Sequence, residues 1–117
     1  MSMLVRLEWF GLFVAALAVY ARLDSSWLLF AALILLPDLS MIGYAAGPKL
    51  GAYAYNAAHA LIGPTLLLLA GLLFPAPLMV AIAVIWLAHI AIDRALGYGL
   101  KLPSGFRDTH IGRIGRD

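Results

Sequence analysis

Four long apolar stretches dominate this chain, and each is about as long as a helix that crosses a bilayer. A transmembrane helix needs about 20 mostly apolar residues. The sequence supplies four such runs, at about 4–22, 27–46, 48–74 and 78–100. Because 64% of the 117 residues are hydrophobic and only 12% are charged, a water-soluble globule of this size could not bury its apolar surface. We therefore predict an all-α fold, a four-transmembrane-helix bundle with short loops.

The remaining residues predict a simple organisation. We expect residues 1–117 to form a single integral membrane domain that ends in a polar C-terminal tail at 101–117. A proline in a helix interior removes a hydrogen bond and clashes with the preceding turn. Pro37 is therefore expected to interrupt the second span, and the pair Gly63 and Pro64 is expected to kink the third. Cysteine is absent, which excludes disulfides and thiolate metal ligands.

The basic residues are distributed unequally between the two sides of the predicted bundle. Four spans place both termini and the second loop on one side of the membrane. That side collects most of the basic residues: Arg6, Lys49, Lys101, Arg107, Arg113 and Arg116. The other side has only Arg22, so the positive-inside rule predicts cytoplasmic termini. Because the net charge of +2 comes from the tail, we expect anionic lipid headgroups as partners and no nucleic acid.

Ionisable side chains inside the predicted spans fall at nearly one depth. With a rise of about 1.5 Å per residue, Asp38 and His89 each lie roughly 17 Å from the outer ends of their spans, and His59 lies roughly 16 Å from the cytoplasmic end of its span. Asp93 follows His89 by one helical turn on the same face. Ionisable groups inside a membrane are costly and indicate a functional site. We predict that these four side chains surround one cavity in the bundle.

The residue types in this cluster favour a divalent metal ion. Imidazole nitrogens and carboxylate oxygens suit Zn²⁺, Mn²⁺ or Fe²⁺, and we predict Asp38, His59, His89 and Asp93 as the ligands. Tyr55 and Asn56 precede His59 by four and three residues, so both are expected to orient its imidazole or to contribute to cofactor binding.

The C-terminal tail carries a second pair of candidate residues. Asp108 and His110 lie where the tail leaves the last span, and a tail that folds back would bring them to the mouth of the cavity. They are predicted as a general acid and base, or as additional ligands. A metal ion with an open position activates water, so we expect a metal-dependent hydrolase that acts on a lipid or other amphipathic substrate.

Other functions remain open at this point. The polar cluster could act as an interhelical clasp in a non-catalytic subunit that packs against itself, as a homodimer, or against a larger membrane complex. Small residues at Gly43, Gly47 and Gly51 would permit close helix contacts in such an assembly. Two histidines at one height could also ligate a b-type haem or contact a quinone.

Two blocks of the sequence carry a family resemblance, at 36–60 and 86–115. Their distinctive motifs are Pro-Asp-Leu-Ser-Met at 37–41, Tyr-Asn-x-x-His at 55–59, His-x-x-x-Asp-Arg-x-x-Gly-Tyr-Gly at 89–99 and Phe-Arg-Asp-Thr-His at 106–110. With these motifs the chain resembles a family of small four-span bacterial membrane proteins known as domain of unknown function 4260. The resemblance implies a multi-pass protein of the bacterial inner (cytoplasmic) membrane, and it implies that the polar residues predicted from depth belong to a shared site.

Overall fold

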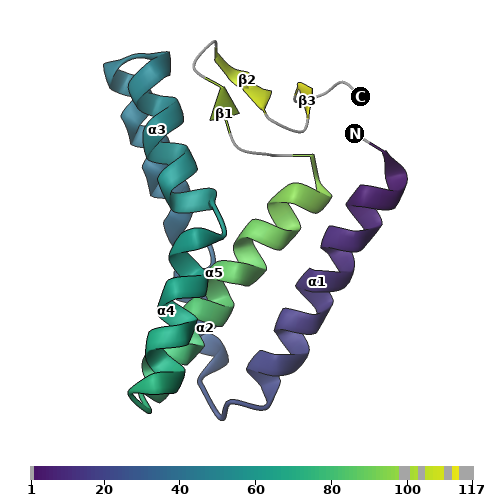
Figure 1. Cartoon of the computed structure of the whole chain (residues 1–117), viewed down its shortest axis with the longest axis vertical. Coiled ribbons are helices and arrows are strands. Elements are labelled where there is room, and N and C mark those ends of the chain that lie inside the picture. Colours follow the sequence, from purple (N-terminus) through teal and green to yellow (C-terminus); the bar gives the residue numbers. More distant parts are fainter. Residues whose placement is uncertain (1, 98–100, 103–104, 110–111, 114–117) are drawn as a thin grey trace.

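The computed structural model describes residues 2–97, 101–102, 105–109 and 112–113 (Figure 1). Helices make up all but the end of this part of the chain. They are α1 (Met3–Ala21), α2 (Trp27–Leu33), the 3₁₀ helix η1 (Leu36–Ala46), α3 (Pro48–His59), α4 (Ile62–Leu73) and α5 (Pro77–Ala95). The tail contains three short strands, β1 (Lys101–Leu102), β2 (Gly105–Thr109) and β3 (Gly112–Arg113).

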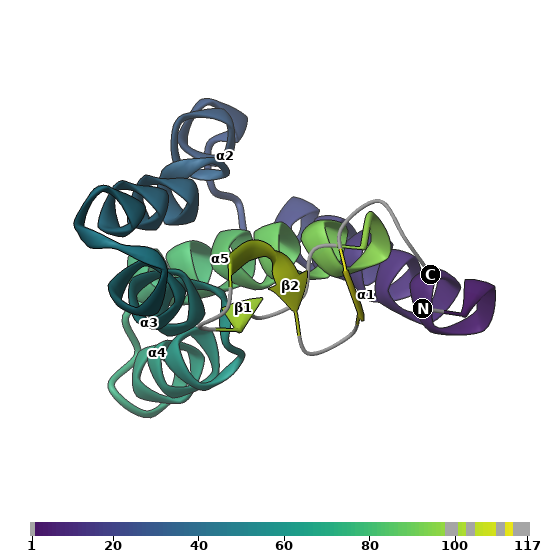
Figure 2. The ribbon, with the colours of Figure 1, turned by 90° about the horizontal axis from the view of Figure 1, so that it is seen from above.

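Helix α5 lies at the centre of the bundle. It packs along α1 on one side and along α4 on another, and α2 also contacts it. Seen from above, α1 lies on one side of α5, and α2 and α4 lie apart from each other toward its other end (Figure 2), where η1 packs against α3. The core follows this arrangement, because most of the fully buried apolar side chains belong to α5. The predicted all-α, four-helix bundle is therefore confirmed, with α2–η1 and α3–α4 as its second and third members.

In the part of the chain that the structure describes, three segments are long and apolar enough to cross a membrane, as expected of a multi-pass membrane protein. They are Met3–Ala21, Lys49–Leu73 and Pro77–Ala95. The second predicted span, 27–46, contains a shorter apolar helix at Trp27–Ser40. The start of α1 and the strands of the tail lie at the same end of the bundle (Figure 1).

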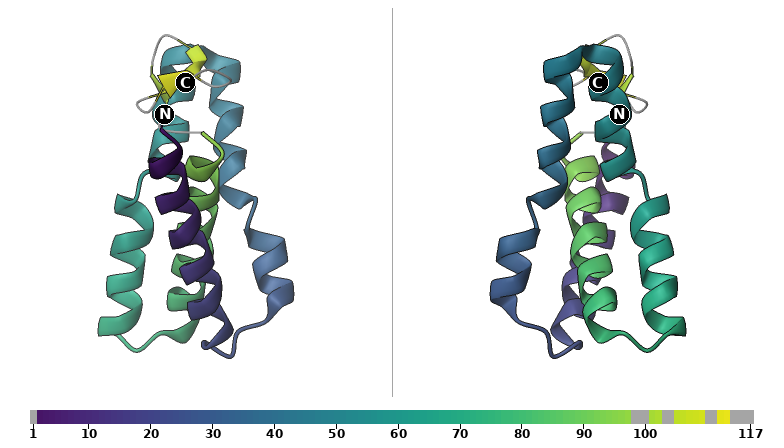
Figure 3. Two further views of the ribbon diagram at one scale, coloured as in Figure 1. Left: turned by 90° about the vertical axis from the view of Figure 1, so that its right-hand side faces the viewer. Right: turned by 90° about the vertical axis from the view of Figure 1, so that its left-hand side faces the viewer.

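The second and third predicted spans are each broken into two helices, and each break lies before a proline (Figure 3). A proline ring clashes with the carbonyl four residues earlier. Accordingly α2 ends at Leu33, four residues before Pro37, and Ala60, four residues before Pro64, adopts an extended conformation between α3 and α4. The kink expected at Pro64 is thus a break at Ala60. Pro64 itself lies in the first turn of α4, where its missing N–H is not needed.

The tail is more ordered than the sequence predicts. Its strands form an antiparallel sheet in the order β1-β2-β3, in which Asp108 is paired with Arg113. Both β1 and β2 contact α3, so the sheet lies over the end of the bundle where α5 ends (Figure 1). These strands have two to five residues, which is too short for an alternating pattern to predict them.

Candidate metal centre

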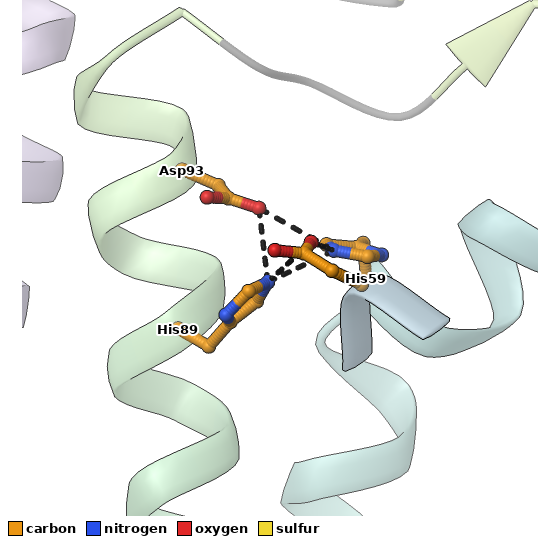
Figure 4. Close-up of side chains that lie close together, drawn as sticks. His59, His89 and Asp93 are labelled. Atoms are coloured by element: carbon orange, nitrogen blue, oxygen red, sulfur yellow. Dashed lines mark hydrogen bonds and ion pairs between the residues drawn. The ribbon is translucent and has the colours of Figure 1, made fainter. Parts of the chain in front are cut away.

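Four side chains from three segments meet between η1, α3 and α5. Asp38 comes from η1, His59 from the last position of α3, and His89 and Asp93 from successive turns of α5. One oxygen or nitrogen atom of each lies within 4.8 Å of the corresponding atom of the other three. Figure 4 shows the two imidazole rings and the Asp93 carboxylate pointing toward one another. The sequence-predicted ligands therefore occupy one site.

The two imidazole Nε2 atoms lie at the middle of this cluster, 3.0 Å apart. Asp38 Oδ1 lies 3.2 Å from Nε2 of His59 and 3.1 Å from Nε2 of His89. Asp93 Oδ2 lies 3.3 Å from the first nitrogen and 3.1 Å from the second. Each carboxylate therefore contacts both histidines, and Asp93 contacts both of them even though only His89 is on its own helix.

Hydrogen bonds to backbone carbonyls fix the tautomers of both histidines. Nδ1 of His59 donates to the carbonyl of Tyr55 at 2.9 Å, and Nδ1 of His89 donates to the carbonyl of Ile34 at 2.5 Å. A carbonyl oxygen can only accept, so Nδ1 carries a proton in both rings. In the neutral rings both Nε2 atoms then present lone pairs to the centre of the cluster. Histidines that bind metals commonly have this second hydrogen bond to a carbonyl.

The carbonyl of Ile34 is available to His89 because of the proline that follows it. In an α-helix this carbonyl would accept from Asp38, and in a 3₁₀ helix it would accept from residue 37. The N–H of Asp38 donates instead to Leu35, at 3.0 Å, and Pro37 has no N–H to offer. Ile34 therefore lacks a partner in its own helix, and the imidazole of His89 supplies the donor.

The second helix break is satisfied in the same way by side chains of α5. Near the break at Ala60, the indole of Trp86 donates to the carbonyl of Ala58 at 2.5 Å, and the guanidinium of Arg94 donates to the carbonyl of His59 at 3.4 Å. Irregular backbone is tolerated at membrane depth only where other groups bond it. Helix α5 thus supplies donors to both breaks: His89 to the first, and Trp86 and Arg94 to the second.

Arg94 also connects the site to α1. Its guanidinium carbon lies 4.6 Å from the centre of the Trp9 ring, in a cation–π contact. The side chain is buried, and its described contacts are with α1 and α3. The sequence analysis missed both Arg94 and Trp86 as donors to this break. Both could have been identified by asking which donor side chains lie at the same membrane depth as the break, because the carbonyls freed by a helix break need hydrogen-bond donors there.

The spacing of the ligand atoms suits a shared metal ion. The five distances that involve an Nε2 atom span 3.0–3.3 Å, close to the roughly 3.3 Å between two ligands that lie about 2.0 Å from one tetrahedral ion, and all four ligand atoms lie within 4.8 Å of one another. Both imidazoles are buried, whereas the Asp38 side chain is 38% exposed. The cluster could therefore hold a divalent ion, with Asp38 as the ligand nearest to the outside.

The same spacing does not fit the haem alternative. Two axial imidazoles bind from opposite faces of a planar macrocycle. Here the Nε2 atoms are 3.0 Å apart, and a carboxylate oxygen of each aspartate lies beside both. There is no room for a macrocycle between them.

The other predicted residues lie around this centre in different ways. The Tyr55 ring is stacked on His59, with ring centres 3.7 Å apart, and its carbonyl, not its hydroxyl, holds Nδ1. Asn56 is half-buried on the next position of α3, where its carbonyl accepts from Ala60 at the helix end. Asp108 belongs to β2, and His110 lies outside the described residues.

Comparison with known proteins adds a family to this geometry. The family model of domain of unknown function DUF4260 matches residues 2–114. No curated protein and no solved structure matches the chain significantly. The matched region contains all four ligand candidates, and it covers nearly the entire sequence. The chain therefore belongs to the DUF4260 family.

Proposed function

We propose that the His/Asp cluster binds one divalent metal ion and that the protein hydrolyses a lipid or other amphipathic substrate. The observation that carries this proposal is the pair of Nε2 atoms 3.0 Å apart, each with its Nδ1 proton committed to a carbonyl. Two lone pairs facing each other repel, so the cluster needs a cation at its centre. Two adjacent carboxylates stabilise such a cation further.

Zn²⁺, Mn²⁺ and Fe²⁺ all take nitrogen and oxygen ligands. When bound, such an ion supplies a Lewis acid and activates water for attack at neutral pH. In ester hydrolysis the water oxygen forms a bond to the acyl carbon, and the bond from that carbon to the alcohol oxygen breaks. The water protons leave on the products, one of them on the departing alcohol.

The residues of this chain would have different roles in hydrolysis. His59, His89 and Asp93 are the more enclosed ligands, and they resemble the three-ligand sets of catalytic sites. Asp38 is the ligand that can give way to water or substrate, because it is the most exposed of the four and belongs to a 3₁₀ segment. Asp108 and His110 of the tail are proposed as the general acid and base; Asp108 belongs to β2, which contacts the adjacent helix α3, and His110 lies outside the described residues.

A proton could also occupy the centre, and this favours a second candidate function. With one imidazole protonated, the cluster would be a set of ion pairs that ties η1, α3 and α5 together. The protein would then be a non-catalytic subunit of an oligomer or membrane complex. The contacts to both carboxylates at 3.1–3.3 Å are compatible with this clasp.

Metal content distinguishes the two functions. Protein purified in detergent, without a metal-affinity tag, should contain about one first-row metal ion per chain by elemental analysis. His59→Ala and His89→Ala should lose it, whereas Glu8→Gln, which changes an exposed carboxylate of α1, should retain it. A folded wild type that neither contains nor takes up Zn²⁺, Mn²⁺ or Fe²⁺ would establish the clasp and refute the metal site.

Turnover tests the hydrolase. Metal-loaded protein should hydrolyse members of a panel of esters, amides and phosphoesters with apolar chains. Asp108→Asn and His110→Ala should retain the ion and lower turnover by about 10²–10⁴-fold, the usual contribution of a general acid or base. Normal metal content without hydrolysis of any panel member would contradict the catalytic proposal and leave the metal site standing.

A further inference from the structure

An apolar cavity of about 260 Å³ lies next to the candidate metal centre. It is lined by residues of α2, the start of η1, the end of α3, α4 and α5. Pro37 and Ala58 of its wall directly precede the ligands Asp38 and His59 in the chain, and Ile85 lies one turn before His89 on α5. The cavity and the cluster therefore share a boundary.

The cavity extends from the cluster away from the tail. Its α5 residues Ile82, Ile85 and Trp86 all precede His89, whereas Asp93 and the tail follow it. Leu36, at the edge of the cavity, is 52% exposed, so the cavity reaches the lipid-facing surface. A molecule in it would have one end at the ligands and the other in the apolar interior of the membrane.

The wall of this cavity offers nothing to a polar ligand. Among the described residues that line it, Trp86 alone has a polar group in its side chain, and its indole N–H is already donated to the carbonyl of Ala58. The remaining lining residues are aliphatic or proline. An apolar group is therefore the only kind of occupant that loses no hydrogen bonds on entering.

We propose that this cavity binds a single alkyl chain of the substrate and places the bond to be broken at the metal centre. The inference rests on the proposed hydrolase function and specifies its substrate class: a single-chain amphiphile whose polar group is attached directly to an unbranched chain. A cavity of this volume, lined by parts of α2, η1, α3, α4 and α5, fits one alkyl chain better than a sterol or two chains lying side by side. The substrate enters from the lipid side, with its polar group toward the tail.

Alkyl hydroxamates provide a probe, because the hydroxamate binds a metal ion and the chain can be varied. We expect octanohydroxamate to bind Zn²⁺-loaded protein, and Leu67→Trp, which fills the cavity from α4, to weaken its binding at least tenfold. Leu66→Trp is the matched control, since Leu66 is 61% exposed and does not line the cavity. Acetohydroxamate, which has no chain, should bind all three proteins within twofold. Because one hydroxamate partitions into detergent to the same extent with each variant, the ratio of its affinities for two variants does not depend on that partition.

The outcomes separate this inference from the function on which it rests. If acetohydroxamate binds and Leu67→Trp leaves octanohydroxamate affinity within twofold of wild type, the chain site is refuted and the open metal site stands. If neither hydroxamate binds loaded protein, the metal centre has no open position and the hydrolase proposal fails.

A photoreactive probe tests the cavity independently of metal. A 16-carbon fatty acid with a diazirine in its chain should label residues 33–37 in the wild type and in Leu66→Trp. Leu67→Trp should reduce this label at least fivefold. Label that is unchanged in Leu67→Trp would overturn the proposal even if hydroxamates bind.

Discussion

Helices α1 and α5 have the same length and nearly equal mean hydropathy, yet they occupy opposite environments. Half of the apolar span of α5, 50%, is buried inside the molecule, against 6% of that of α1. Tyr20 is the one buried side chain of α1. Hydropathy therefore shows that both helices suit a membrane, and it does not show which of them lies at the centre.

The polar side chains account for the difference. Each polar residue in the second half of α5 bonds a group on another helix: Trp86 and Arg94 bond carbonyls of α3, and His89 bonds the carbonyl of Ile34. In α1 the side-chain hydrogen bonds to another helix come from its first turns, where Arg6 donates to the carbonyls of Ala95 and Leu96 at the end of α5. A helix whose polar groups must all be satisfied inside the protein becomes the helix that the others surround.

The largest effect is expected from the ligands on α5. His89→Ala removes one ligand and also leaves the carbonyl of Ile34 without its donor. Metal affinity should fall by more than the roughly 10–100-fold that is typical of residues behind the ligands. Phe10→Ala, at an exposed position of α1, should leave affinity unchanged in the same Zn²⁺ titration. Equal affinities for the two variants would contradict the central role of α5 in the site.

Arg94→Met should destabilise the fold by about 1–3 kcal/mol, because a buried carbonyl loses its donor and the contact with Trp9 is lost. Arg22→Met, at the exposed end of α1, should stay within about 0.5 kcal/mol of wild type. Thermal unfolding in one detergent checks both. A drop in melting temperature for Arg22→Met as large as that for Arg94→Met would show that burial does not distinguish these arginines.

Two glycines allow a matched test of packing. A Cβ at Gly63 would lie 2.5 Å from the Trp86 ring, whereas a Cβ at Gly11 of α1 meets nothing within 4 Å. Gly63→Ala should therefore cost about 1–3 kcal/mol through overpacking, while Gly11→Ala should gain about 0.5–1 kcal/mol through helix propensity. The sign of the change in unfolding midpoint is the measurement. A stabilising Gly63→Ala would mean that α4 and α5 are not in close contact.

The smallest effect concerns the single buried residue of α1. Tyr20 donates its hydroxyl proton to the carbonyl of Ser26, and its ring contacts Trp27 and Phe30. Tyr20→Phe keeps the ring and should lose only about 0.5–1 kcal/mol. Tyr53→Phe, at an exposed position of α3, should have no effect on the unfolding midpoint. A loss above about 2 kcal/mol for Tyr20→Phe would mean that the hydroxyl holds more than this bond.

Much of the site could be predicted because depth along a helix depends only on residue number. The fixed rise per residue placed Asp38, His59 and His89 at one height, and the turn of the helix placed Asp93 beside His89. Rotation of each helix about its axis depends on packing between helices. The sequence therefore could not establish that these side chains point inward, and the spacing of 3.0–3.3 Å among their ligand atoms came only from the structure.

The positions of the helix breaks were predictable only in part. Pro37 and Pro64 predict a break in the second and in the third span. Each break lies four residues before its proline, where the proline ring would clash with a carbonyl. Which carbonyls need outside donors follows from those positions, and which side chains supply them follows from the packing of α5. The sequence did not predict the strands of the tail, because they are short and are paired through contacts within the folded tail.

The sequence by itself determined that the chain suits a lipid bilayer, that its fold is helical and how deep its polar residues lie, because these depend on composition and on the regular rise of a helix. The tertiary structure decided which helix is central, which carbonyls the histidines bond and where the apolar cavity lies beside them. Those features depend on contacts between segments far apart in the chain, which no local pattern encodes.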